Sequence, residues 1–218
     1  MFPKVKICCI SNIDEAKVAI SFGASALGLV AKMPSGPGVI SDEEIKKIAA
    51  FIPPPIASFL LTSETDALQI ILHQKKVGTN TIQIVDELKS GSYEEIHAAL
   101  PGIKIVQVIH VTGKESIEQA LSISKHVDAL LLDSGNPTLQ VKELGGTGRT
   151  HDWNISRKIR DAVSVPIFLA GGLNPENVRE AISFVKPFGV DVCSGVRTNG
   201  KLDPLKVERF VNSVHNSK

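Results

Sequence analysis

Short apolar runs recur along the chain, and each is followed by a turn and then by an amphipathic stretch. The runs are rich in Val, Ile and Leu and lack strict polar alternation, as is typical of strands that are buried on both faces. This pattern predicts eight strands, at residues 5–9, 26–30, 56–61, 81–85, 103–109, 129–132, 167–170 and 189–192.

The segments between these runs carry helix start signals. Ser41 with Glu44, and Ser92 with Glu95, have the spacing of a capping box, in which the side chain and backbone at a helix start bond reciprocally. Ser63 is expected to open the helix after the third strand. Strand and helix therefore alternate along the whole chain.

Strict alternation of this kind, repeated eight times, predicts an α/β fold, a single (β/α)8 TIM barrel that spans residues 1–218 as one domain. The alternative is a doubly wound open sheet. That fold usually carries a glycine fingerprint after its first strand, whereas here Cys9, Ile10 and Ser11 follow.

Composition restricts the partners. Lys plus Arg number 24 and Asp plus Glu number 23, a formal net charge of +1, so no nucleic acid and no anionic membrane is expected as a partner. The chain shows neither a signal peptide nor an apolar stretch of roughly 18 residues. Its three cysteines, two of them adjacent, do not suggest a disulfide framework, and a cytoplasmic location is expected.

Glycines follow the last two predicted strands. Gly171 and Gly172 come after the seventh, and Ser194 and Gly195 come after the eighth. In TIM barrels the loops after the strands build the active site, and the loops after strands seven and eight often bind phosphate. Glycine allows close approach to the backbone amides, so these four residues predict the binding site for a small phosphorylated substrate.

The loop after the sixth strand is long and also rich in glycine. Gly146, Gly148 and Arg149 offer free backbone donors and a cation, which suit closure over an anion. The loop lacks the lysine and hydroxyl residue of a phosphate-binding P-loop, so its glycines alone are a weak signal.

Candidate chemistry lies at two other strand ends. Cys8 and Cys9 end the first strand, where side chains alternate between the two faces, so only one of them is expected to face the substrate. Asp133 ends a wholly apolar strand, which favours a functional role. Lys6 is costly to bury unpaired, and is expected either to bind substrate at the active-site end or to pair with a neighbour such as Asp191.

His110 follows the fifth strand, but no companion histidine or carboxylate has metal-ligand spacing. A solvated side chain is therefore expected rather than a ligand. The sequence predicts no metal site and no cofactor.

Taken together, these residues resemble the phosphoribosylanthranilate isomerase family, whose opening motif usually reads KICGIT. The matching segments are VKIC (5–8), ISN (10–12), GASALG (23–28), LLD (131–133), GGTGRTHDW (145–153), AGGLNPENV (170–178) and VDVCSGV (190–196).

The resemblance implies an isomerase of tryptophan biosynthesis that converts N-(5-phosphoribosyl)anthranilate to 1-(2-carboxyphenylamino)-1-deoxyribulose 5-phosphate by an Amadori rearrangement. It implies Cys8 as the general base and Asp133 as the general acid, without cofactor or metal. The expected assembly is a monomer or a homodimer.

The chain departs from the family pattern at three places. Gly38 stands where the family commonly has an arginine that holds the anthranilate carboxylate, and Arg149 or Lys32 is expected to supply that charge instead. Cys9 stands where the family has glycine, and Arg197 replaces a frequent glutamate.

Two alternatives follow from these departures. One is an isomerase of a different phosphorylated aminosugar. The other is a non-catalytic phosphosugar-binding barrel, which would have no use for an acid and a base.

Overall fold

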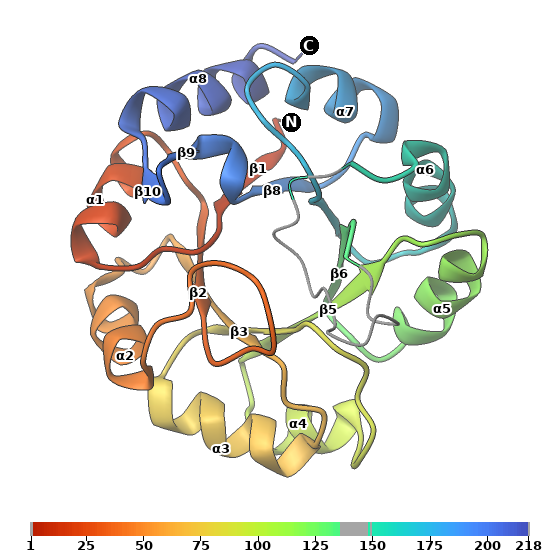
Figure 1. Cartoon of the computed structure of the whole chain (residues 1–218). Helices are drawn as coiled ribbons and strands as arrows, with labels where there is room; N and C mark the ends of the chain where they lie inside the picture. The colour runs from red at the N-terminus through yellow and green to blue at the C-terminus, as the bar shows by residue number, and fades with distance from the viewer. Residues whose placement is uncertain (1, 136–147, 149, 218) are drawn as a thin grey trace.

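In the computed structural model, which describes residues 2–135, 148 and 150–217, eight parallel strands close into a barrel in the order of the sequence. Strand β8 pairs with β1 and completes the ring. Figure 1 looks along the barrel and shows the helices as an outer ring around the strands. The strands are β1 (Lys4–Ile7), β2 (Ala26–Val30), β3 (Ala57–Thr62), β4 (Thr81–Ile84), β5 (Lys104–His110), β6 (Ala129–Asp133), β7 (Ile167–Leu169) and β8 (Gly189–Val192).

A helix follows each strand, and a short insertion follows β8. The helices are α1 (Ile13–Ser21), α2 (Asp42–Phe51), α3 (Ala67–Val77), α4 (Tyr93–Ala99), α5 (Glu115–Ile123), α6 (Trp153–Ala162), α7 (Val178–Val185) and α8 (Pro204–His215). The insertion contains the 3-10 helix η1 (Ser194–Val196) and the two-stranded hairpin β9 (Arg197–Thr198) and β10 (Lys201–Leu202). The predicted (β/α)8 TIM barrel is confirmed, while its extent as one domain over residues 1–218 stays a prediction.

The helix start signals are confirmed with two corrections. Ser92 and Glu95 form the full capping box. At the start of α2 the Ser41 hydroxyl accepts a hydrogen bond from the Glu44 backbone N–H, but the Glu44 side chain does not bond back to the Ser41 backbone. The expectation that Ser63 opens α3 is wrong. The Asp66 carboxylate caps that helix instead, and the Ser63 hydroxyl donates to a carbonyl of the loop after β2.

Side chains on each strand alternate between two buried layers. On β1, Val5 and Ile7 belong to the apolar layer between the strands and the helices, whereas Cys8, the next residue after β1, belongs to the layer inside the barrel. Phe59 and Phe168 meet edge to face inside the barrel, with ring centroids 5.9 Å apart. These rings fill the barrel interior toward the amino-terminal ends of the strands. The polar inward-facing side chains lie nearer the carboxyl-terminal ends.

Among the described residues, no helix combines the length and the apolar character needed to cross a bilayer.

Candidate active site

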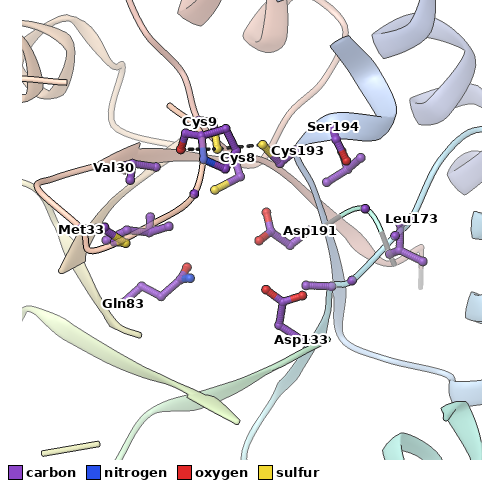
Figure 2. A pocket seen from close by; sticks show the side chains of 18 of the residues that line it. Cys8, Cys9, Val30, Met33, Gln83, Asp133, Leu173, Asp191, Cys193 and Ser194 are labelled. Atoms are coloured by element: carbon purple, nitrogen blue, oxygen red, sulfur yellow. Dashed lines mark hydrogen bonds between the residues drawn. The ribbon is translucent and has the colours of Figure 1, made fainter. Parts of the chain in front are cut away.

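A cavity opens at the carboxyl-terminal ends of the strands. Its space, including the open mouth, is about 650 Å³. Figure 2 shows the lining side chains arranged around this hollow. They come from the ends of β1, β2, β3, β4, β6, β7 and β8 and from the loop after β2, the place where barrels carry their active sites.

Cys8 and Asp133 face this cavity from strands β1 and β6. Both are largely buried, with exposed fractions of 6% and 8%. In Figure 2 the Cys8 thiol points from one side of the cavity toward the carboxylates on the other. The Asp133 carboxylate accepts hydrogen bonds from the Ser134 backbone N–H at 2.7 Å and hydroxyl at 3.4 Å, which fix its orientation. A thiol and a carboxyl therefore stand on opposite walls of one pocket.

Gly28 on β2 makes room for the Cys8 side chain. A Cβ at this position would lie 2.8 Å from the Cys8 sulfur and 3.0 Å from the Lys6 Nζ, closer than ordinary van der Waals contact. The inward position on β2 is therefore left without a side chain so that two β1 side chains can occupy the barrel interior.

Lys6 lies inside the barrel and is not among the residues that line the cavity. Its side chain is fully buried, and its Nζ donates to the Asp191 carboxylate at 2.9 Å. Burial opposes the charged ammonium, but the Asp191 carboxylate outweighs it and raises the pKa of Lys6. Pairing with Asp191 was one of the two outcomes expected from sequence. The assignment of Lys6 to substrate contact stays a prediction, and the structure gives it no surface in the cavity lining.

Both cysteines at the end of β1 line the cavity, so the expectation that only one would face it is wrong. Strand β1 ends at Ile7, and Cys9 has φ +62°, so the strand's alternation stops before it. The Cys9 thiol donates to the Pro37 carbonyl at 3.6 Å, and its Cβ fills the space that a Cβ on Gly38 would need. The glycine at Gly38 and the cysteine at Cys9 are therefore sterically coupled.

The glycine loops after β7 and β8 lie against each other beside the cavity. Gly171, Gly172 and Ser194 line it. Gly195 packs so closely that a Cβ there would overlap the Leu173 carbonyl oxygen. The backbone N–H groups of Gly172, Ser194 and Gly195 donate to no acceptor among the described residues.

The helix and hairpin after β8 are tied to the end of β1 by Arg197. Its guanidinium donates to the carbonyls of Cys8 and Cys9 and makes two 3.1 Å bonds to Glu15 on α1. Burial opposes ionisation of Glu15, but hydrogen bonds from Arg197 and from the Leu202 and Ser11 backbones outweigh it and lower the pKa of the carboxyl. These contacts hold the position of the Cys8 backbone.

Sequence reasoning missed Gln83 as a cavity residue. This side chain projects from β4 into the pocket, and its buried Oε1 has no hydrogen-bond partner among the described residues. A polar residue inside an otherwise apolar strand was the available signal. His110 was expected to be solvated and is instead buried, with its Nε2 2.9 Å from the Val85 carbonyl.

The loop after β6 is described only in part. Gly148 lines the cavity, as expected of a residue that closes over substrate. Gly146 and Arg149, predicted with it, lie outside the described residues. Within the part of the chain that is described, no lysine or arginine lines the cavity, and no cluster of metal-ligating side chains was found.

Known proteins share this architecture and sequence over nearly the whole chain. Residues 5–213 match the family model of N-(5'-phosphoribosyl)anthranilate isomerase. The enzyme of that name from Methanothrix thermoacetophila is 36% identical over 211 residues, 97% of each chain.

Two solved structures are similar in fold and in sequence. The phosphoribosyl anthranilate isomerase of Thermotoga maritima superposes with a TM-score of 0.80 at 31% identity, over 98% of each chain. A phosphoribosyl anthranilate isomerase in complex with reduced 1-(o-carboxyphenylamino)-1-deoxyribulose 5-phosphate gives a TM-score of 0.78 at 29% identity, again over 98% of each chain.

Proposed function

The chain belongs to the N-(5'-phosphoribosyl)anthranilate isomerase family, and from this premise we propose that Cys8 and Asp133 perform the proton transfers of its reaction. The enzyme catalyses the Amadori rearrangement of N-(5-phosphoribosyl)anthranilate to 1-(2-carboxyphenylamino)-1-deoxyribulose 5-phosphate, a step of tryptophan biosynthesis. The observation that carries the assignment is the opposition of the Cys8 thiol and the Asp133 carboxyl across one cavity.

Asp133 serves as the general acid. Its carboxyl group donates a proton to the ring oxygen of the ribose, the bond from that oxygen to C1 breaks, and the anthranilate nitrogen becomes the iminium of a Schiff base. The hydrogen bonds from Ser134 hold the carboxyl in one direction, which favours proton transfer to a substrate held in a fixed position.

Cys8 serves as the general base. Its thiolate removes the proton from C2, the electron pair moves toward the iminium, and the resulting enolamine tautomerises to the C2 ketone. The substrate gains one proton from Asp133 and loses one to Cys8, so the reaction is a net isomerisation that needs no external oxidant or reductant. Gly28 and Arg197 support this role by giving the thiol space and by fixing its backbone.

The phosphate is held by the loops after β7 and β8. The unpartnered N–H groups of Gly172, Ser194 and Gly195 are suited to an anion, and Gly171 and Gly148 leave the approach open. We assign Gly146 and Arg149 to the loop after β6 that closes over the substrate, with Arg149 pairing with the anthranilate carboxylate.

The alternative of a different phosphorylated aminosugar depended on the glycine at Gly38. The contact with Cys9 explains this glycine in another way, because a side chain at position 38 would overlap the Cys9 Cβ. The absence of an arginine at Gly38 therefore does not require a different substrate. The non-catalytic alternative is disfavoured by the retained acid and base.

The test is complementation of a tryptophan auxotroph that lacks only this isomerase, followed by fluorescence assay of anthranilate-derived substrate with the purified enzyme. Growth without tryptophan and turnover are expected, and Cys8→Ser should abolish both. Failure of the folded wild-type protein in both assays would reject the proposed function.

We further propose a cytoplasmic enzyme that is a monomer or a homodimer, which light scattering distinguishes.

A further inference from the structure

Two thiols that the acid-base mechanism does not use meet beside the active site. The sulfurs of Cys9 and Cys193 lie 2.7 Å apart although the residues are 184 positions apart in sequence. Strands β1 and β8 pair in register, with Ile7 opposite Val192, and so bring the two strand ends together. Figure 2 shows this pair joined at the rim of the cavity while the Cys8 thiol points into it.

The backbone at Cys9 favours glycine, yet a cysteine is present. A φ of +62° is uncommon for residues with a side chain. This conformation turns the Cys9 thiol out of the strand's alternation and against Cys193. A side chain retained in an unfavourable conformation is a reason to look for a function.

The surroundings favour thiol chemistry over metal binding. Cys9 and Cys193 both border the cavity, and the half-buried Cys193 is the one that a small reagent reaches from it. The described residues contain no cluster suited to a metal. The contact with the Cys9 sulfur lowers the pKa of the Cys193 thiol, with Arg197 adding to the effect, although burial opposes it. Hydrogen bonds with Cys193 and Cys8 raise the pKa of Cys9. Cys193 is thus the thiol that attacks first.

We propose that Cys9 and Cys193 form a redox-active dithiol, a modification site beside the catalytic thiol that reacts with disulfide oxidants and binds trivalent arsenicals. The Cys193 thiolate attacks a disulfide RSSR, forms a mixed disulfide and releases one thiol RSH. The Cys9 thiolate then attacks the Cys193 sulfur and releases the second RSH. Two cysteine thiols are oxidised to one disulfide, and RSSR is reduced to two RSH.

The disulfide reaches catalysis through Cys8. Cys9 follows Cys8 directly in the chain, and the Arg197 guanidinium donates to the backbone carbonyls of both residues. A disulfide ties the Cys9 side chain to the end of β8 and thereby moves the adjoining Cys8 thiol from its place in the cavity. The thiol chemistry does not rest on the proposed catalytic roles, whereas this effect on turnover does.

The test treats the reduced, full-length enzyme with oxidised glutathione or diamide and counts thiols by alkylation and mass spectrometry after denaturation. Of the three thiols, one is expected to remain alkylable, with a loss of two hydrogen atoms from the intact mass. Trypsin places Cys9 in peptide 7–17 and Cys193 in peptide 180–197, and these peptides should be linked.

Variants identify the partners. Cys8→Ser should still form the link, which excludes Cys8 as the partner, whereas Cys193→Ser and Cys9→Ser should not form it. Phenylarsine oxide should bind wild type and Cys8→Ser and leave Cys193→Ser unmodified. A link confined to peptide 7–17, a link lost in Cys8→Ser, or three freely alkylable thiols after oxidation would overturn the site.

Turnover tests the coupling separately. The oxidised wild type should turn over at least about tenfold more slowly and recover on reduction with dithiothreitol, because a small displacement of a catalytic group lowers the rate by this order or more. Cys193→Ser should keep its rate under the same oxidant. A mapped disulfide with undiminished turnover would disprove the coupling to Cys8.

Discussion

The ammonium of Lys6 lies 2.9 Å from the carboxylate of Asp191, directly across the β1–β8 pairing. Both side chains are inside the barrel, and Asp191 also lines the cavity. The pair therefore places a neutralised carboxylate beneath the substrate site, and leaves Cys8 and Asp133 as the acid-base pair on its walls.

Lys6→Met should destabilise the protein by about 3–5 kcal/mol, because it leaves the Asp191 charge buried without its partner. Urea unfolding of the variant measures this loss. Asp191→Asn should also destabilise, and the double variant should lose less than the sum of the two. Strictly additive losses would show that the two groups do not interact.

Cys8→Ser and Asp133→Asn should lower kcat by roughly 10²–10⁴-fold, because each removes a proton transfer in the transition state. KM should change much less, since neither substitution removes the phosphate loops. Steady-state kinetics of both variants and of Cys9→Gly, the matched control, test this. An inactive Cys9→Gly together with an active Cys8→Ser would mean that the base was assigned to the wrong cysteine.

Gly28→Ala should reduce kcat and cost about 1–3 kcal/mol of stability, because the new methyl group overpacks the barrel against the Cys8 sulfur and Lys6. Chemical denaturation and kinetics measure the two effects. Gly113→Ala is the control, since its methyl group would meet only the end of the exposed Glu115 side chain. Equal behaviour of the two variants would argue against a role for Gly28 in placing the thiol.

Cys9→Gly should reduce the loss of stability that Gly38→Ala causes. In the wild-type background the alanine Cβ meets the Cβ of Cys9, and its backbone is also strained at φ +80°. A glycine at position 9 removes the overlap between the two Cβ atoms but leaves the backbone strain. A double-mutant cycle by thermal unfolding should therefore show a favourable interaction energy. Absence of coupling would mean that the two departures from the family pattern are independent.

Glu15 should make stability depend on pH in mildly acidic solution. Its pKa is lowered in the folded protein from the usual 4.5, so the unfolded state binds more protons in this range. The stabilisation is thus present above the unfolded pKa and is lost as pH falls through the folded value. Urea unfolding at several pH values gives the free energy of unfolding as a function of pH. This free energy should depend less steeply on pH in Glu15→Gln, and also in Arg197→Met, than in wild type. A slope as steep as that of wild type in Glu15→Gln would assign the pH dependence to other groups.

The sequence by itself determined the barrel and the position of its chemistry. Eight doubly buried strands alternating with capped helices leave few folds available, and side-chain alternation along β1 and β6 directs Cys8 and Asp133 to one interior. Because active sites in barrels lie at strand ends, the residues at those ends could be named before any contact was known. The glycines after β7 and β8 were found in the same way.

The tertiary structure alone decided which distant residues meet. The contacts of Arg197 with Glu15 and of Cys9 with Cys193 join residues more than 180 positions apart, and no local pattern encodes them. The left-handed backbone at Cys9 ended the alternation that was expected to turn one cysteine away from the cavity, and it linked Cys9 to Gly38. Periodicity sets the face of a strand residue, but the register of the closed barrel and the conformation of its loops set the partner.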